Sequence, residues 1–313
     1  MHPIEVLVNF GRYALNREAH AREDADALAE LERQPLTLPR GLDIEWLGVA
    51  GYRLTYEGQT LLIDPYFTRY SLADLVRRRP MLPDPAQIDR YLPGVESVAG
   101  VLAGHAHFDH AVDIPAIARR FGAPALGSTS LHKLMRLHRL GKQATAVEPY
   151  HPYELGPFRV TFIPSEHVKL LLGLAVPYPG DITCDHLEGL TGGAYRCGQT
   201  WGIHVEVAGV SLYHCGSANL VDEAIPDGLR VDYLLAGVAG RVYTGDYWRR
   251  LLRRTDPGVV VITHHDDFFQ PLDTPLAFST NVHVAGVSDE VRRVNRDLPV
   301  AALPRVQPAL PTS

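Results

Sequence analysis

The segment VLAGHAHFDHAVDI, residues 101–114, places three histidines and an aspartate within six positions, directly after a short apolar run. In an extended segment, residues two positions apart point to the same side, so His105 and His107 can present their imidazoles to one point. Asp109 and His110 follow after a turn and can face a neighbouring point. Imidazole and carboxylate ligands suit Zn²⁺, with Mn²⁺, Fe²⁺ or Ni²⁺ as alternatives. The segment therefore predicts a binuclear metal centre. Two ions about 3.5–4 Å apart would bind the attacking and the leaving oxygen of a hydrolysis reaction.

The elements around this segment predict two mixed sheets covered by helices. Apolar runs predict strands at residues 43–49, 52–57, 59–67, 97–104, 123–128, 143–148, 158–165, 200–209, 210–217, 231–238, 258–265 and 300–304. Composition and spacing predict helices at residues 1–34, 112–120, 128–139, 245–256 and 287–296. Hairpins followed by alternating strands and helices occur twice in this order. We therefore expect a helical extension over residues 1–40 and a single α+β domain over residues 41–313, built of two similar halves.

Composition and charge narrow the class of protein. The 313-residue chain carries a formal net charge of -6, which argues against a nucleic-acid partner. Its three cysteines are too few and too scattered for a disulfide framework, and the N-terminal segment lacks the pattern of a secretory signal peptide. Since no run of about 18 apolar residues is present, we expect no transmembrane segment. We expect a cytoplasmic protein that acts on a small-molecule substrate, and a homo-oligomer is compatible with the sequence.

The segment HAHFDH, residues 105–110, resembles the His-x-His-x-Asp-His signature of the metallo-β-lactamase superfamily. The order of elements from about residue 42 to 305 is similar to that of the superfamily, and residues 44–67 resemble the opening hairpins of one branch. That branch includes the ascorbate-phosphate lactonase-like proteins and the N-acyl-phosphatidylethanolamine phospholipase D. The resemblance implies a four-layer αββα sandwich of two mixed sheets. Where the branch often has a histidine after Trp-Leu-Gly, this chain has Val49 and Ala50.

The resemblance also implies two histidine ligands further along the chain. His167 follows the strand predicted at residues 158–165 and would be the third ligand of the first metal. The last ligand of the second metal should end a late strand, often with an aromatic residue four positions on. Both His264 and His265 fit, and we favour His264 because the ligand in this branch directly ends the strand. The first metal would then be held by His105, His107 and His167. The second would be held by Asp109, His110 and His264.

One expected carboxylate is missing. The superfamily normally has an aspartate that bridges both metals after a late strand and a glycine, and here Ser217 stands in that place. A hydroxyl is a much poorer ligand than a carboxylate. We favour a second metal held by its three protein ligands alone, with water or substrate as the bridge. The alternatives are that Cys215 or Asp222 substitutes, or that one metal binds firmly and the other weakly.

Several other features have two interpretations. Asp64 is either an anchor for a metal-bound histidine or a turn-capping residue before a proline. Residues 66–95, rich in proline, are expected to form a solvated surface loop, with a substrate lid as the alternative. Residues 169–195 either line an acyl or lipid pocket or pack into the core. Arg69 and Arg241 are candidates for binding a phosphate near the cleft.

Together these features predict a metal-dependent hydrolase with a binuclear site. The resemblance implies that a metal-activated hydroxide attacks a phosphodiester or a lactone or ester, and that Asp109 orients the nucleophile or accepts its proton. The alternative is a degenerate or mononuclear metal-binding member without hydrolytic activity, since Ser217 replaces the bridging aspartate. About two equivalents of bound metal would favour the first interpretation.

Overall fold

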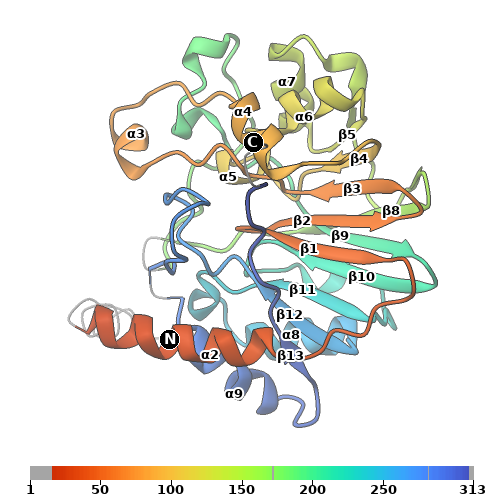
Figure 1. The fold of residues 1–313 in the computed structure, drawn as a ribbon, viewed down its shortest axis with the longest axis vertical. Helices are drawn as coiled ribbons and strands as arrows, with labels where there is room; N and C mark the ends of the chain where they lie inside the picture. Colours follow the sequence, from red (N-terminus) through yellow and green to blue (C-terminus); the bar gives the residue numbers. More distant parts are fainter. Residues whose placement is uncertain (1–15, 171–172, 281, 310–313) are drawn as a thin grey trace.

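The computed structural model describes residues 16–170, 173–280 and 282–309, and it contains two β-sheets with helices on both outer faces (Figure 1). The strands of the first sheet follow one another in chain order: β1 (Asp43–Gly48), β2 (Gly51–Tyr56), β3 (Gln59–Ile63), β4 (Val98–Leu102), β5 (Ala125–Gly127) and β6 (Ala144–Ala146). Strands β1 to β3 pair antiparallel, whereas β3 to β6 pair parallel. The first sheet is therefore mixed, as its sequence pattern predicts.

The second sheet repeats this arrangement. Its strands are β7 (Pro152–Leu155), β8 (Phe158–Ser165), β9 (Thr200–Val207), β10 (Val210–Cys215), β11 (Tyr233–Gly237), β12 (Val259–Thr263) and β13 (Val300–Ala301). Strands β7 to β10 pair antiparallel and β10 to β13 pair parallel. The sequence did not predict β7, because the strand begins at a proline. Proline is tolerated there since β7 lies at the edge of its sheet.

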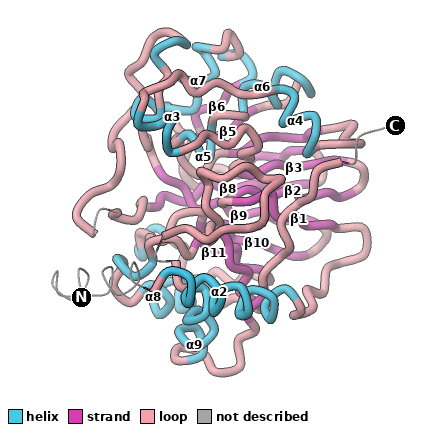
Figure 2. The backbone as a smooth tube through the Cα atoms, turned by 60° about the vertical axis from the view of Figure 1, so that its left-hand side comes forward, coloured by secondary structure: helices cyan, strands magenta, loops and turns pink. Residues whose placement is uncertain are grey.

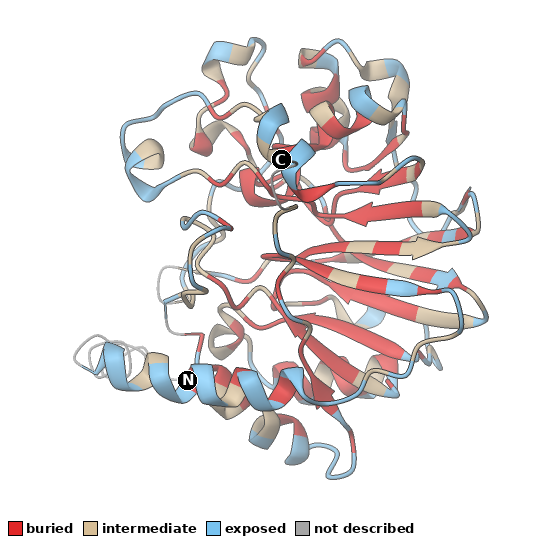
Figure 3. Cartoon of the chain, in the orientation of Figure 1, coloured by how far each residue is buried: buried red, intermediate tan, exposed pale blue. Residues whose placement is uncertain are grey.

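Helices form the two outer layers of the sandwich (Figures 1 and 2). The first sheet is covered by α4 (Pro85–Tyr91), α6 (Ile114–Phe121) and α7 (Thr129–Leu137), whose apolar residues share one buried cluster with that sheet. The second sheet is covered by α2 (Arg17–Glu32), α8 (Tyr247–Thr255) and α9 (Val287–Arg292) in the same way. A third cluster lies between the sheets, and Figure 3 shows the strands largely buried. The predicted αββα sandwich is confirmed.

Local sequence signals account for these elements. In β2, Tyr52 and Leu54 point into the cluster between the sheets and are fully buried. Helix α6 ends at Phe121 and is capped by Gly122, which adopts a left-handed φ of 65° that glycine accommodates without strain. Helix α7 begins after Ser128, whose side chain accepts a hydrogen bond from the backbone N–H of Leu131 at 3.4 Å. These caps set where the helices over the first sheet begin and end.

Residues 66–95 are only in part the solvated surface loop that we expected, since residues 71–73 and 76–80 are exposed. This segment contains α3 (Leu72–Val76) as well as α4. Phe67 and Met81 are buried in the same cluster as the helices over the first sheet. A β-bridge also pairs Pro80 with Thr191. The prolines suggested an exposed loop, but the apolar residues between them bury against the sheet and hold the segment in place.

The helix predicted over residues 1–34 is present as α2, while residues 1–15 lie outside the described part of the chain. Leu28 and Leu31 of α2 pack into the cluster on the second sheet. Asp24, which is buried, accepts a hydrogen bond from the backbone N–H of Ala285 at 2.9 Å. The helix predicted over residues 287–296 is shorter, because α9 ends at Arg292. None of the helices within the described ranges has the length and apolarity needed to cross a bilayer.

The C-terminal segment ties the two sheets together. After β13, the chain passes back to β1, where Trp46 and Arg305 form a parallel β-bridge (Figure 1). The backbone N–H of Val306 donates to the carbonyl oxygen of Trp46 at 2.9 Å. The Arg305 side chain donates to the carbonyl oxygens of Leu272 and Thr274 at 3.0 and 2.6 Å. These contacts hold the loop that follows β12 against the first sheet.

His138, which follows α7, predicts how acid weakens the fold. Burial, with a contribution from the Arg119 guanidinium, lowers the pKa of His138 from 6.5 to about 4. As the pH falls from about 6.5 to about 4, the unfolded chain therefore binds a proton that the native chain does not bind, and native stability decreases. Between pH 7 and pH 5, we expect the unfolding free energy of the wild-type protein to fall by about 2 kcal/mol more than that of His138→Leu. Urea unfolding at both pH values tests this. The exposed His151→Leu is the control, and an unaltered pH dependence in His138→Leu would contradict the prediction.

Candidate metal centre

Loops from both sheets meet at one edge of the sandwich and carry the candidate ligands. Strand β4 leads into the loop with His105 and His107, and then into the one-turn helix α5 (Phe108–Ala111), which carries Asp109 and His110. Three further loops come from the second sheet and follow β8, β10 and β12. They carry His167, Ser217 and His264, respectively. The sandwich thus brings together residues that are far apart in the sequence.

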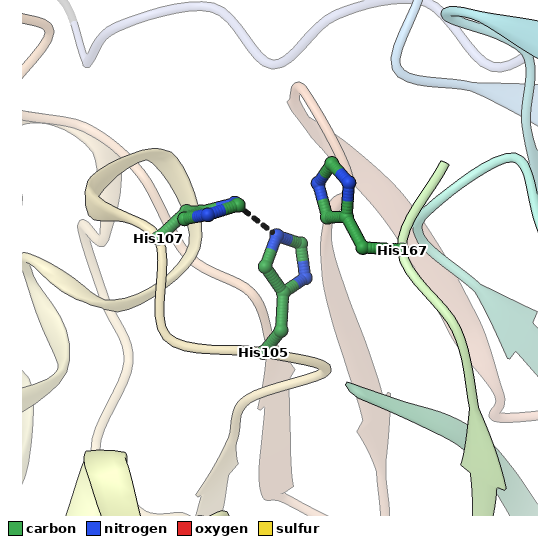
Figure 4. A group of neighbouring side chains, drawn as sticks. All are labelled: His105, His107 and His167. Carbon is green, nitrogen blue, oxygen red and sulfur yellow. Dashed lines mark hydrogen bonds between the residues drawn. The ribbon is translucent and has the colours of Figure 1, made fainter. Parts of the chain in front are cut away.

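His105, His107 and His167 form the first group (Figure 4). One ring nitrogen from each lies within 4.8 Å of the others, and His105 Nε2 is 2.9 Å from His107 Nδ1. Backbone carbonyls hold the outward nitrogens of two rings: His107 Nε2 donates to Pro177 O at 2.9 Å, and His167 Nδ1 donates to Val168 O at 2.7 Å. Because a carbonyl only accepts, the nitrogens that face the carbonyls carry the protons. The other nitrogen of each of these two rings keeps a lone pair for a metal.

Asp109, His110 and His264 form the second group. Asp109 Oδ2 lies 3.6 Å from His110 Nε2 and 3.6 Å from His264 Nε2. We expected a turn before Asp109, and the structure shows that Asp109 and His110 both lie within the short helix α5. The structure therefore brings all six predicted ligands together, in the two groups of three that the sequence predicts.

Asp64, which follows β3, lies beneath the second group. Its Oδ2 is 2.8 Å from His110 Nδ1 and 3.1 Å from His214 Nε2, and its Oδ1 accepts from the Gly104 N–H at 2.6 Å. A Cβ atom at either Gly104 or Gly216 would lie 3.0 Å from Oδ2, so both glycines leave room for this carboxylate. Asp64 holds Nδ1 of His110 and directs Nε2 toward Asp109. These contacts favour the anchoring role over a turn-capping one.

The structure places His264, and not His265, beside Asp109. The backbone N–H of His264 and the Thr263 hydroxyl both donate to the carbonyl oxygen of Val49, each at 2.7 Å. His265 is fully buried and stacks on Trp46, with ring centroids 4.3 Å apart. The loop that has Val49 where the branch often has a histidine therefore anchors the segment that presents His264.

Burial and neighbouring charges set the protonation of these groups. Burial lowers the pKa of His105 well below 6.5, that of His107 to about 4 and that of His167 to about 3. These rings are therefore neutral at pH 7, which is the form that binds a metal. Burial alone would raise the pKa of Asp109, but His110 and His264 outweigh it and lower that pKa. Burial alone would lower the pKa of His110, but the Asp64 and Asp109 carboxylates outweigh it and raise that pKa. The donor set is thus imidazoles with one ionised carboxylate, which fits a divalent metal.

The sequence did not point to two buried groups that support the site. His214 contacts Asp64, as described above. Asp266 accepts from the Val49 N–H at 2.8 Å and from Arg69 Nη2 at 2.9 Å, and both side chains of this ion pair are buried. The sequence offers one indication that Asp266 supports the site, which is its position directly after two histidines. For His214 the sequence shows only a polar residue in an apolar strand. Arg69, a candidate for phosphate binding, is thus occupied by Asp266.

Comparison with known proteins identifies the family. The family described as Beta-lactamase superfamily domain matches residues 43–264 of this chain. The chain belongs to the beta-lactamase superfamily. This match includes both groups of candidate ligands and Asp64, and it confirms the resemblance seen in the HAHFDH segment.

Curated relatives within this superfamily carry the name UPF0173 metal-dependent hydrolase. The protein from Anaeromyxobacter sp. (strain K) is 25% identical over 269 residues, which cover 83% of this chain and 82% of that one. The protein from Paracoccus denitrificans (strain Pd 1222) is 28% identical over 126 residues, which cover 40% of this chain and 49% of that one. The chain thus spans about half the length of several of the curated relatives it matches.

Solved structures show the same fold at low identity. The metallo hydrolase Igni18 from Ignicoccus hospitalis KIN4/I has a TM-score of 0.52 and 18% identity, covering 86% of this chain and 97% of that one. CmlA, a diiron beta-hydroxylase from Streptomyces venezuelae, has a TM-score of 0.54 and 14% identity, covering 88% and 55%. Since one of these proteins is a hydrolase and the other a hydroxylase, the shared fold alone does not specify the chemistry of this superfamily member.

Ser217 marks where this chain departs from the superfamily pattern. Its hydroxyl accepts a hydrogen bond from the backbone N–H of Val168 at 3.0 Å, so it supports the loop that carries His167. Neither proposed substitute for the bridging aspartate joins the ligand groups. The Cys215 thiol donates to the Ser217 carbonyl oxygen at 3.1 Å, and the Asp222 carboxylate accepts from Arg250 Nε at 2.8 Å. These contacts argue against Cys215 or Asp222 as a replacement for the bridging carboxylate.

Restoring a carboxylate at position 217 should strengthen binding of the second metal. In Ser217→Asp, one oxygen can keep the bond from Val168 while the other faces the ligand groups. We expect the dissociation constant of the weaker metal to fall on the order of 10-fold, since a carboxylate is a much better ligand than a hydroxyl. Competition titration with a chromophoric chelator measures both affinities. Ser217→Asn, which is similar in size but neutral, is the control, and an equal gain in both variants would contradict a ligand effect.

Proposed function

We propose that this chain is a metal-dependent hydrolase with a binuclear site. The observation that carries the proposal is the convergence of six donor side chains, in two groups of three, at one edge of the sandwich. The first metal would be held by His105, His107 and His167. The second would be held by Asp109, His110 and His264. Zinc suits this mixture of imidazole and carboxylate, and Mn²⁺, Fe²⁺ and Ni²⁺ are the alternatives.

The surrounding residues support a hydrolytic role. When bound, divalent metals make water more acidic and polarise the oxygen of a carbonyl or phosphoryl group. Asp109 is ionised and faces both histidines of its group, so it can orient the attacking water or accept its proton. Asp64 keeps the His110 ring in place, because its carboxylate holds the far nitrogen of that ring. A cavity of about 610 Å³ adjoins both groups, and this size suits a small-molecule substrate.

A mononuclear or degenerate metal-binding protein is the second candidate. The observation that favours it is Ser217, whose hydroxyl is engaged with the Val168 N–H and stands where the superfamily normally has a bridging carboxylate. With three donors in each group, the second metal depends on its own ligands alone. In this case one metal would bind firmly, the other would bind weakly or not at all, and no hydrolysis would be seen.

Metal analysis and an activity screen separate the two candidates. Protein purified without chelator and dialysed against zinc is analysed for bound metal, and then assayed on phosphodiesters, lactones, esters and thioesters. About two equivalents of metal with hydrolysis that chelator abolishes and zinc restores support the binuclear hydrolase. One equivalent or none, with no hydrolysis of any substrate, would contradict it and support the second candidate.

We also propose that the chain works in a reducing compartment such as the cytoplasm. Its three cysteines are free thiols, and burial raises the pKa of Cys197 to about 11 and that of Cys215 to about 12. These two thiols are therefore protonated and inert at neutral pH. Localisation of a fluorescent fusion in the source cell tests this proposal.

A further inference from the structure

The cavity beside the metal groups has an apolar wall made by aromatic residues. Phe108, Phe268 and Phe269 all line it. The rings of Phe268 and Phe269 lie 4.4 Å apart between centroids, and Phe108 lies 6.1 Å from the first and 6.2 Å from the second. Phe268 also contacts His264 edge to face, at 5.9 Å. The aromatic wall, as we call these three residues, therefore begins directly at the second group.

Further apolar residues line the cavity. Leu170, Val176 and Tyr178 come from the segment after His167, and Tyr243 ends the short 3-10 helix Arg241–Tyr243. Leu75 of α3 also lines the cavity and packs in the same cluster as the aromatic wall. Since His107 donates to the carbonyl oxygen of Pro177, the segment after His167 is fixed to the first group. Each of the two interpretations of residues 169–195 holds for one part of the segment. The first part lines the cavity. The second part, with Leu190 and Tyr195, packs into the core.

The charge of the cavity wall comes from the side chains that line it. Among the described residues that line it, none is a lysine or an arginine, and Asp109 and Asp267 add negative charge. Arg69 is paired with Asp266 in the interior. Arg241 is also buried: its Nε donates to Glu290 at 2.7 Å and its Nη2 donates to the His283 carbonyl oxygen at 2.8 Å. The two arginines considered for phosphate binding are therefore both committed to structural contacts outside the cavity.

These walls favour an uncharged substrate with an apolar part. When bound, the proposed metals would offset the charge of a phosphodiester at the reacting group, but the apolar walls beyond them offer no partner to a further charge. An acyl chain or aromatic group gains from leaving water in the same place. Resting on the hydrolase function proposed above, we infer that the substrate is a neutral carboxylic ester or lactone whose apolar acyl group packs against the aromatic wall and Val176.

The proposed reaction is an ordinary ester hydrolysis. The oxygen of water forms a bond to the carbonyl carbon, and the acyl C–O bond breaks. The alkoxide takes up a proton and leaves as an alcohol, while the acyl part is released as a carboxylic acid. In a lactone both groups stay in one molecule. No oxidant, reductant or further co-reactant is consumed, and Asp109 is the side chain placed to move the proton.

Chain-length dependence tests this inference on the metal-loaded protein. We expect kcat/KM on p-nitrophenyl esters to rise at least 10-fold from acetate to octanoate, and to exceed that on bis(p-nitrophenyl) phosphate at least 100-fold. The unreactive ketone 2-decanone should bind at least 10-fold more tightly than 2-pentanone in calorimetry. A flat chain-length series, equal binding of the two ketones, or faster hydrolysis of the phosphodiester would each overturn the inference.

A charge placed in the wall provides a matched comparison. Val176→Arg should reduce the octanoate rate and 2-decanone binding at least 10-fold and raise phosphodiester hydrolysis, because it adds the missing cation. Leu174→Arg adds the same charge in the same loop, at a residue that is 74% exposed and does not line the cavity, and should change neither. Equal effects of the two variants would count against the inference. Hydrolysis of the phosphodiester alone would overturn only the substrate class, whereas metal-loaded protein that hydrolyses neither class would overturn the proposed function with it.

Discussion

Asp109→Ala is expected to lower kcat/KM by at least about 10³-fold on any substrate that the wild-type protein hydrolyses. Asp109 is the one carboxylate among the six candidate ligands, and its Oδ2 is 3.6 Å from both His110 and His264. Those two neighbours lower its pKa against the effect of burial, so the carboxylate is ionised at neutral pH. The substitution therefore removes the proposed carboxylate ligand of the second metal and the side chain proposed to orient water. Steady-state kinetics and metal analysis on the same preparation measure both effects.

Two comparison variants make this result specific. Asp185→Ala removes an exposed carboxylate that belongs neither to the ligand groups nor to the cavity lining, and it should leave kcat/KM within about two-fold. Asp109→Asn keeps the size of the side chain and should lose activity nearly as fully as alanine, because the lost property is charge. Circular dichroism and thermal unfolding check that each variant is folded. A folded Asp109→Ala protein with two bound metals and wild-type turnover would rule out the role proposed for Asp109.

The sequence predicts those parts of the site that depend on short spacing or on the end of a strand. His105 and His107 converge because two positions in an extended segment bring side chains to one side, and the structure places their nearest nitrogens 2.9 Å apart. The superfamily resemblance supplied His167 and His264, which lie after β8 and β12. Apolar runs predicted most strands because the sandwich buries them on one or both faces.

Contacts between distant segments could not be predicted in this way. Asp64 and His214 are 150 residues apart, and Arg69 and Asp266 are 197 apart. Nothing in the local sequence says which buried carboxylate meets which base, so Arg69 was considered for a phosphate. The burial of Phe67 and Met81 within residues 66–95 could not be predicted for a related reason. Prolines argue against regular structure, but only the fold shows which apolar residues between them find a surface to cover.

Asp64→Asn should weaken both the fold and the second metal site. Asp64 is fully buried, and its carboxylate contacts His110, His214 and the Gly104 N–H. Asparagine suits the left-handed backbone at this position, where φ is 45°, but it carries no charge and offers one acceptor oxygen. We expect the free energy of unfolding to fall by about 3–5 kcal/mol, the cost of removing one partner from a buried pair. Urea unfolding of the metal-free protein measures it.

The metal-binding result of the same variant separates anchoring from general destabilisation. Without the carboxylate at Nδ1, the His110 ring loses the contact that directs Nε2 toward Asp109, and affinity for the second metal should fall about 10- to 100-fold. Asp113→Asn is the matched control. It removes another fully buried carboxylate, which accepts from the backbone N–H groups of Phe67 and Thr68 at 2.5 and 2.9 Å. This control should lose stability and keep its metal affinity. If both variants lose stability and neither loses metal affinity, Asp64 supports the fold alone, and His110 is held in place by packing.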